Sequence, residues 1–246
     1  MPAGAEFGPA DRARRADVDA PVKFADTRMP HIERSTLAAA CGHAAVRKGQ
    51  RSMALIKRIC VYCGASGNVD ESYRAAAIRM GSVLAENGIG LVYGGGRVGL
   101  MGLMADAALA YGGEVIGIIP GHLHEREIGH TGLTKLLVVG SMHERKQTMF
   151  EMADAFAILP GGFGTLEEAL ECITWRQLGL HDKPIFLIDV QKYWVPLVHL
   201  FEHVVDSGFA PRKARSLYEV LPRVEDLPDA VLKAPEPRAT AKSGLV

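Results

Sequence analysis

The sequence predicts an α/β fold: a single domain built on a Rossmann-like, doubly wound parallel sheet with helices on both faces. Three observations support this prediction. Short apolar runs alternate with longer amphipathic segments, as in parallel sheets that are covered on both sides. Gly88 and Gly112 follow two of the longer segments, where glycine commonly ends a helix. Glycine-rich segments follow several apolar runs, and such sheets bind ligands at these places.

The expected strands are short, continuous apolar runs, which is the pattern of strands buried on both faces. They lie near residues 57–63, 89–93, 114–119, 135–139, 154–159 and 184–189. The expected helices are the longer segments between and after these runs. They lie near residues 71–87, 99–111, 142–152, 165–178 and 193–207.

Composition separates the folded domain from two tails. Residues 1–52 are rich in Ala, Arg, Asp and Pro without a sustained apolar period, so we expect a disordered N-terminal extension. The folded domain is expected over residues 53–233, and residues 234–246 are expected to form a flexible C-terminal tail. Met53 stands just before the first strand and is therefore a candidate translation start.

The charge and hydropathy of the chain favour a small-molecule ligand. It has 28 basic and 28 acidic residues, and the basic ones do not gather into a stripe, so neither nucleic acid nor an anionic membrane is an expected partner. No apolar run approaches the roughly 20 residues of a membrane helix, and the N-terminus lacks the hydrophobic core of a signal peptide. We therefore expect a cytoplasmic protein.

Neither a metal site nor redox chemistry is expected. Cys60 and Cys63 lie in a strand-like run, where residues three apart point to opposite faces, whereas reactive pairs usually lie at a helix N-terminus. Cys41 and Cys172 form no second close pair for zinc, and the histidines within residues 122–130 lack a helical ligand spacing. Buried structural thiols are the favoured interpretation.

Three glycine-rich segments are expected at the carboxyl edge of the sheet, at residues 64–67, 94–102 and 160–168. Backbone N–H groups in such loops, together with the N-terminus of the following helix, can bind phosphate. The predicted phosphate loop consists of Gly95, Gly96, Gly161, Gly162, Gly164 and Thr165. The alternative is that the glycines serve only tight turns between strand and helix. A dinucleotide site is disfavoured, because no clear acidic residue ends the strand after residues 94–99.

Two cations begin the helix expected at residues 142–152. Arg145 and Lys146 follow the strand near 135–139 and so reach the same edge of the sheet, where they can face a phosphate. The alternative is a charged first turn of a helix that lies simply in solvent.

The acids after the last glycine loop need their own explanation, because they would repel a phosphate. Thr165 and Glu168 have the spacing of a capping box, in which each side chain satisfies a backbone N–H of the other. Alternatively, Glu168 acts on a part of the ligand that is not phosphate. Spacing alone favours the capping box.

The segments 94–102, 142–146 and 160–168 together resemble the LOG (LONELY GUY) family, the cytokinin riboside 5′-monophosphate phosphoribohydrolases. The resemblance extends over nearly all of residues 57–205. It implies a homodimer that hydrolyses the N-glycosidic bond of an N6-modified adenosine 5′-monophosphate (AMP), releasing the base and ribose 5-phosphate. It also implies that the reaction needs no metal or redox cofactor.

The resemblance assigns roles by motif position. It implies Arg145 and Glu168 as the catalytic pair. The implied substrate contacts are Glu127, Arg145, Lys146, Gly162, Phe163, Gly164, Thr165, Leu166, Glu167, Glu168 and Thr174. Glu127 and Thr174 stand in less distinctive surroundings, so their assignment rests on spacing.

The implied chemistry fits these residue types. Breaking a ribosyl C–N bond builds positive charge on the sugar, which a carboxylate such as Glu168 stabilises while it polarises the attacking water. Glu167 or Glu127 is a candidate second carboxylate, and the acid and base are left unassigned. Arg145 is a candidate to fix the substrate or assist the leaving base, because its planar guanidinium is always charged.

Two other functions remain open. A protein with these loops could only bind a nucleotide or a phosphorylated cofactor, as the related molybdenum-cofactor carriers do. The joint presence of Arg145 and Glu168 argues against that function, since a carrier requires neither. A lysine decarboxylase, a label that members of the family have carried, needs a Schiff-base lysine, and no lysine here has a recognisable setting for it. The sequence leaves open whether the substrate is a cytokinin nucleotide or AMP itself.

Overall fold

The computed structural model describes residues 56–127 and 129–235, without the side chains of residues 125–127. The expected N-terminal extension, the candidate start Met53 and residues 236–246 of the expected C-terminal tail lie outside the described residues.

The described residues form one seven-stranded parallel sheet with the order β4-β3-β2-β1-β5-β6-β7. The strands are β1 (Arg58–Tyr62), β2 (Gly90–Tyr93), β3 (Val115–Pro120), β4 (Lys135–Val139), β5 (Ala155–Ile158), β6 (Ile185–Ile188) and β7 (Glu219–Leu221). The predicted α/β sheet and its six strands are confirmed. The sequence analysis missed β7, whose three residues are too few to show a pattern.

The helices of the described residues are α2 (Glu71–Glu86), α3 (Gly99–Ala110), α4 (Gly121–Glu127), α5 (Met142–Met152), α6 (Phe163–Gln177), α7 (Val195–Asp206) and α8 (Leu227–Lys233). Short 3₁₀ segments are η2 (Val190–Lys192), η3 (Arg212–Ser216) and η4 (Val224–Asp226). The five predicted helices are confirmed within a few residues. The seven-residue helices α4 and α8 were missed, since about two turns are too short for a clear apolar period.

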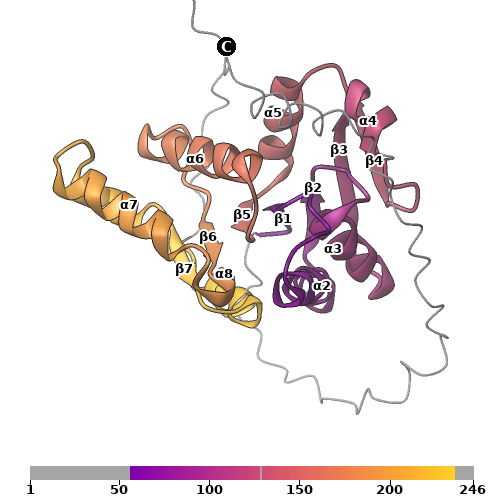
Figure 1. The fold of residues 1–246 in the computed structure, drawn as a ribbon, viewed down its shortest axis with the longest axis horizontal. Helices are drawn as coiled ribbons and strands as arrows, with labels where there is room; N and C mark the ends of the chain where they lie inside the picture. Colours follow the sequence, from indigo (N-terminus) through magenta and orange to yellow (C-terminus); the bar gives the residue numbers. More distant parts are fainter. Residues whose placement is uncertain (1–55, 128, 236–246) are drawn as a thin grey trace, which may run out of the picture. The chain divides into compact units, whose positions relative to one another are not determined.

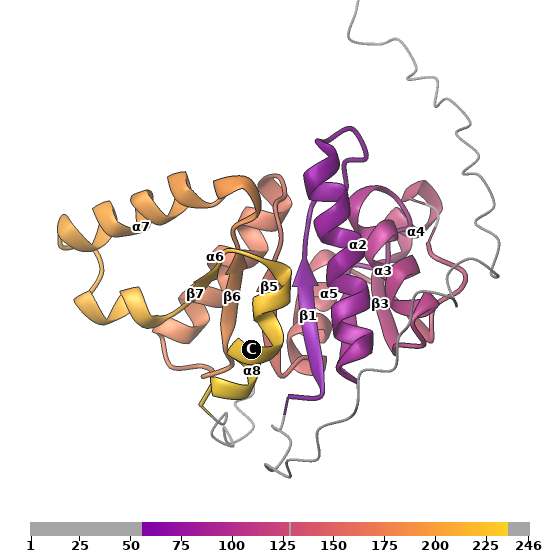
Figure 2. The ribbon, with the colours of Figure 1, turned by 90° about the horizontal axis from the view of Figure 1, so that it is seen from below.

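Helices cover both faces of the sheet and produce two apolar cores. Figure 1 shows α5 and α6 on one side of the strands and α2 and α3 on the other. One core joins α2, α3 and α8 to the sheet, and the other joins α5, α6 and α7 to its opposite face. Figure 2 looks onto one face of the sheet from below, with α2 beside β1 and α7 at the far end of the sheet.

The two close cysteines belong to different cores, as their strand spacing predicts. Cys63 packs in the core of α2 and α3, whereas Cys60 packs in the core of α5 and α6. Both are free and buried, as is Cys172, and burial raises the pKa of each thiol. The prediction of buried structural thiols is thus confirmed for these three; Cys41 lies outside the described residues. Among the described helices, none has the length and apolarity that a membrane span requires.

Candidate active site

A cavity of about 270 Å³ opens at the carboxyl ends of β1 and β5. The chain winds outward in opposite directions from these two neighbouring strands, so this is the topological switch point where open α/β sheets bind ligands. The lining residues come from the segments after β1, β2 and β5 and from α5. They are Val61, Tyr62, Cys63, Gly64, Ala65, Gly94, Met101, Met142, Arg145, Met149, Gly162, Gly164, Thr165, Glu167 and Glu168.

The N-terminus of α6 faces this cavity without a side-chain cap. Gly162 is the N-cap residue, and no side chain accepts a hydrogen bond from the first turn. Uncapped N–H groups and the positive end of the helix dipole together favour an anion. Gly162, Gly164 and Thr165 of the expected phosphate loop line the cavity at this helix start.

The capping-box alternative for Thr165 and Glu168 is wrong. Helix α6 begins at Phe163, so Thr165 lies inside the first turn instead of preceding it. Its buried hydroxyl packs against Gly161, where an added Cβ would lie 2.1 Å from the Thr165 Oγ1. Glu168 therefore does not take part in a capping box, and it lines the cavity.

The other glycines of the loop are not required by packing within the chain. A Cβ added at Gly162 or at Gly164 would meet no atom within 4 Å, and neither residue has a left-handed φ. Their small size is therefore unexplained by the protein itself. A side chain at either position would project into open space.

Arg145 is buried, and backbone carbonyls fix its guanidinium group. The Arg145 Nε donates to the Ile118 oxygen at 3.2 Å, and one terminal nitrogen donates to the Gly94 oxygen, also at 3.2 Å. Gly94 must be glycine for this arrangement, because an added Cβ would lie 2.0 Å from that nitrogen. The remaining donors of a fork with five N–H groups can serve a ligand in the cavity.

The carboxyl group of Glu168 has an altered acidity. Burial raises the pKa of Glu168 to about 7, while the nearby positive charge of Arg145 acts in the opposite direction and the charge of Glu167 adds to the rise. A carboxyl group with this pKa can change its protonation near neutral pH, as general acid and base groups do.

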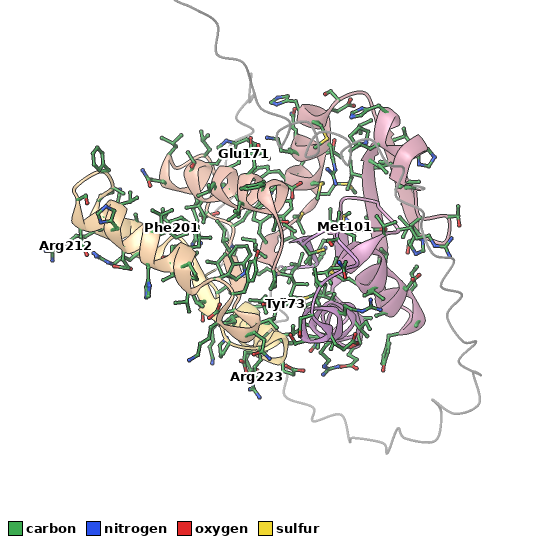
Figure 3. All side chains as sticks on the ribbon, in the orientation of Figure 1. Tyr73, Met101, Glu171, Phe201, Arg212 and Arg223 are labelled. Atoms are coloured by element: carbon green, nitrogen blue, oxygen red, sulfur yellow. The ribbon has the colours of Figure 1, made fainter. Side chains whose placement is uncertain are left out.

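Lys146 does not face the cavity as an isolated cation. Its ammonium group pairs with the carboxylates of Glu167 and Glu171 on α6, the latter at 2.9 Å. These ion pairs join α5 to α6 at the rim of the cavity. Burial lowers the pKa of Lys146, but the hydrogen bonds to the two acids outweigh this effect, so the pKa of Lys146 is raised. Figure 3 shows Glu171 on the side of α6 that faces α5.

Other predicted residues lie outside the cavity lining. Gly95 has a φ of +76° and packs against β3, a conformation that favours glycine, and Gly96 forms an isolated antiparallel bridge with Gly129. Gly161 lines a neighbouring cavity, and Thr174 lines a different hollow between α6 and α7.

Two further predicted contacts, Phe163 and Leu166, are not among the described residues that line the cavity. Phe163 is 92% exposed, and Leu166 packs toward the core of α5 and α6. Glu127 ends α4, and its side chain is outside the described part of the chain.

Comparisons of the sequence with known proteins identify a family. A family model described as "possible lysine decarboxylase" matches residues 101–231. The cytokinin riboside 5′-monophosphate phosphoribohydrolase LOG7 of Arabidopsis thaliana is 47% identical over 171 residues, covering 70% of this chain and 79% of that protein. The phosphoribohydrolase LOG of Oryza sativa subsp. japonica is 45% identical over 190 residues, covering 77% of each chain.

Solved structures share the fold. The molybdenum cofactor carrier protein from Chlamydomonas reinhardtii has a TM-score of 0.56 at 22% identity, covering 73% of this chain and 98% of that one. The molybdenum cofactor binding protein from Rippkaea orientalis has a TM-score of 0.55 at 18% identity, with the same coverage. At such identities the likeness concerns the fold alone, which is the predicted Rossmann-like sheet.

Proposed function

Since the chain belongs to the LOG family of cytokinin riboside 5′-monophosphate phosphoribohydrolases, we propose that it hydrolyses the N-glycosidic bond of adenosine 5′-monophosphates. The products are a free base, adenine or an N6-modified cytokinin, and ribose 5-phosphate. One observation carries the proposal: a single cavity joins the uncapped N-terminus of α6 to Arg145 and Glu168.

The cavity divides the substrate between an anion site and a reacting site. Gly162, Gly164 and Thr165 offer N–H groups to the 5′-phosphate at the start of α6. Glu168 stands about one helical turn further along α6. The phosphate and the carboxylate are thereby separated, and Glu168 acts at the ribose instead of opposing the phosphate charge.

Glu168 stabilises the positive charge that develops on the ribose as the C–N bond breaks, and its carboxylate takes a proton from the attacking water. The pKa of about 7 suits this exchange, because the group is a stronger base than an ordinary carboxylate. The alternative second carboxylate, Glu167, is paired with Lys146. Arg145, fixed by two carbonyls, orients the nucleotide or holds negative charge on the leaving base.

The rival functions have less support. A pure carrier needs no carboxyl group with a raised pKa beside an anion site, and the likeness to carriers is a likeness of fold. A decarboxylase needs a lysine in the site, but no lysine is among the cavity-lining residues that the structure describes. Lys146, which follows the cavity residue Arg145 in the sequence, is the nearest candidate for a Schiff-base lysine, and it is paired with Glu167 and Glu171.

The test is incubation with AMP and with N6-isopentenyl-AMP, followed by chromatography of the base and an assay of ribose 5-phosphate. We expect equal amounts of the two products and none from the Glu168→Gln variant. The ratio of kcat/KM for the two nucleotides identifies the preferred substrate. Tight binding of both nucleotides without release of base would refute the proposal in favour of a carrier.

Gly164→Ala is expected to fold normally and to lose hydrolysis by at least about tenfold. A methyl group at this position meets no protein atom, so stability stays the same or rises by up to about 1 kcal/mol, as for glycine to alanine in a helix. The methyl group instead occupies the space assigned to the phosphate. The melting temperature measures the predicted stability, and kcat/KM for AMP measures the predicted loss of hydrolysis.

The matched control is Gly121→Ala, at the first position of α4, where an added Cβ makes only an ordinary contact with Val138. It should keep full activity. An active Gly164→Ala enzyme would contradict the placement of the phosphate.

We also propose that the enzyme is a homodimer formed through α6 and α7. Apolar side chains on these helices and the loop after α7 remain exposed: Leu170 at 43%, Leu200 at 54% and Phe209 at 87%. A mostly apolar hollow lies between the two helices, with Phe201 on its α7 side. Exposed apolar surface of this kind is typical of an interface. A dimer would also explain why Thr174, an expected substrate contact, lines this hollow and not the cavity of its own chain.

Sedimentation should give twice the 26.5 kDa of one chain. Leu200→Asp is expected to give a monomer, because a buried unpaired carboxylate is costly at an interface. Leu232→Asp on α8, also exposed, should remain dimeric. A wild-type monomer at micromolar concentration would refute the dimer without affecting the proposed reaction.

A further inference from the structure

The loop of residues 160–162 lies between two cavities: Gly162 lines both of them, and Pro160 and Gly161 line the second. The catalytic cavity lies on one side. A second cavity of about 320 Å³ lies on the other, and it shares Gly64, Ala65 and Gly162 with the first. The loop therefore borders open space on the side of the second cavity, where hydrogen bonds help to set its conformation.

One of these hydrogen bonds comes from Tyr193. Its hydroxyl donates to the Gly161 oxygen at 2.6 Å from the side of the second cavity, which Tyr193 lines. The Tyr193 ring is fixed by edge contacts to Tyr73, with centroids 5.6 Å apart, and to Trp194, at 4.8 Å. A second bond, from the Gly64 nitrogen to the Pro160 oxygen at 3.1 Å, ties the loop to the end of β1.

The backbone that presents Tyr193 is strained. Gln191 and Lys192 have φ values of +54° and +59°, which are unfavourable for residues with a Cβ. The turn is held in place by Trp194, whose backbone nitrogen donates to the Asp189 Oδ1 at 2.7 Å and whose indole nitrogen donates to the Ile158 oxygen at 3.2 Å. Strain maintained in this way is characteristic of functional segments.

We propose that Tyr193 is a positioning residue for the phosphate, an inference that rests on the proposed function. The peptide unit between Gly161 and Gly162 is planar, so its C=O and N–H groups point in opposite directions. Tyr193 holds the carbonyl on the side of the second cavity and thereby turns the Gly162 N–H toward the catalytic cavity. The strained turn before Tyr193 therefore fixes the position of the Tyr193 hydroxyl. This hydroxyl in turn orients the Gly162 N–H, the first N–H group of the anion site.

The test is the Tyr193→Phe variant, which removes only the hydroxyl. We expect the dissociation constant for ribose 5-phosphate, measured by calorimetry, to rise about two- to twelvefold, the range for loss of one hydrogen bond. The KM for AMP should rise by a similar factor while kcat stays within about twofold, because the phosphate contact is the same before and during bond cleavage. The inhibition constant for adenine should not change. Tyr111→Phe, at an exposed tyrosine after α3, should match the wild type throughout.

Each outcome decides the inference. Unchanged binding of ribose 5-phosphate would overturn it, and equal weakening of ribose 5-phosphate and adenine would show a general structural role instead. A wild-type protein that binds ribose 5-phosphate but releases no base would refute the proposed function, while the binding comparison would still test Tyr193. A wild-type protein that binds neither ligand would contradict both.

Discussion

Glu168→Gln is expected to abolish hydrolysis of AMP, by about a thousandfold or more, and to stabilise the folded protein at pH 8. The loss of activity follows because glutamine can neither take a proton from water nor carry the charge that stabilises the ribosyl cation. The gain in stability follows because burial raises the pKa of Glu168 from 4.5 to about 7. Ionisation of this group therefore opposes folding.

The direction of the pH effect can be derived. Below pH 4.5 the carboxyl group is protonated in both the folded and the unfolded chain, so it has no effect on the free energy of unfolding. Between pH 4.5 and about 7 only the unfolded chain is ionised, so the wild type loses stability as the pH rises, and above this window the loss is constant. The Glu168→Gln variant does not lose this stability, because glutamine does not ionise. After allowance for partial solvent access, the difference should reach about 1–3 kcal/mol at pH 8.

Urea unfolding of both proteins at pH 5 and pH 8 measures the effect, together with chromatography of the released base. Glu86→Gln is the control, since Glu86 is an exposed residue in a surface ion pair with Arg79. It should keep its activity and gain no stability. A Glu168→Gln protein that still hydrolyses AMP, or that is less stable than the wild type at pH 8, would contradict the assignment.

Six of the seven strands could be predicted because each is a short apolar run, and because Gly88 and Gly112 mark the ends of two of the helices between them. Leu91-Val92-Tyr93 and Ala155-Phe156-Ala157-Ile158 are buried on both faces, so their sequences carry the whole signal. The start of α6 could not be located in this way. Thr165 is a strong N-cap residue by type, but the helix begins two residues earlier, at Phe163. Its N-cap residue is Gly162, which has no side chain that would mark the helix start in the sequence.

The lining of the candidate site was predictable where charged side chains form it, and not where backbone groups hold those side chains in place. The positions of Glu168 and Arg145 follow from helices that begin at the carboxyl edge of a parallel sheet. The carbonyls of Ile118 and Gly94 that fix Arg145 have no signature in the sequence, because every residue has a carbonyl. Tyr193 was missed for a related reason: its role depends on two left-handed residues, Gln191 and Lys192, of types that rarely adopt this conformation.

Arg145→Met should lower kcat/KM for AMP by at least about a hundredfold, the usual effect of losing a fixed charged donor in an active site. The variant should also shift the pH dependence. In the wild type we expect kcat/KM to rise with pH through about 7 as Glu168 ionises. Arg145 lowers the pKa of Glu168 against the effect of burial, so without this charge the rise should move to higher pH.

Arg145→Lys separates charge from geometry. A lysine ammonium keeps the positive charge near Glu168, so the rise of kcat/KM should stay close to pH 7. It cannot reproduce the planar fork that donates to the Ile118 and Gly94 oxygens, so activity should still fall markedly at every pH. Profiles of kcat/KM from pH 5.5 to 9, with circular dichroism to confirm folding, measure both effects. Identical profile midpoints in the wild-type, Met and Lys proteins would show that Arg145 does not control the ionisation of Glu168. Full activity of the Lys variant would show that charge alone suffices, and that the carbonyl anchors serve only the fold.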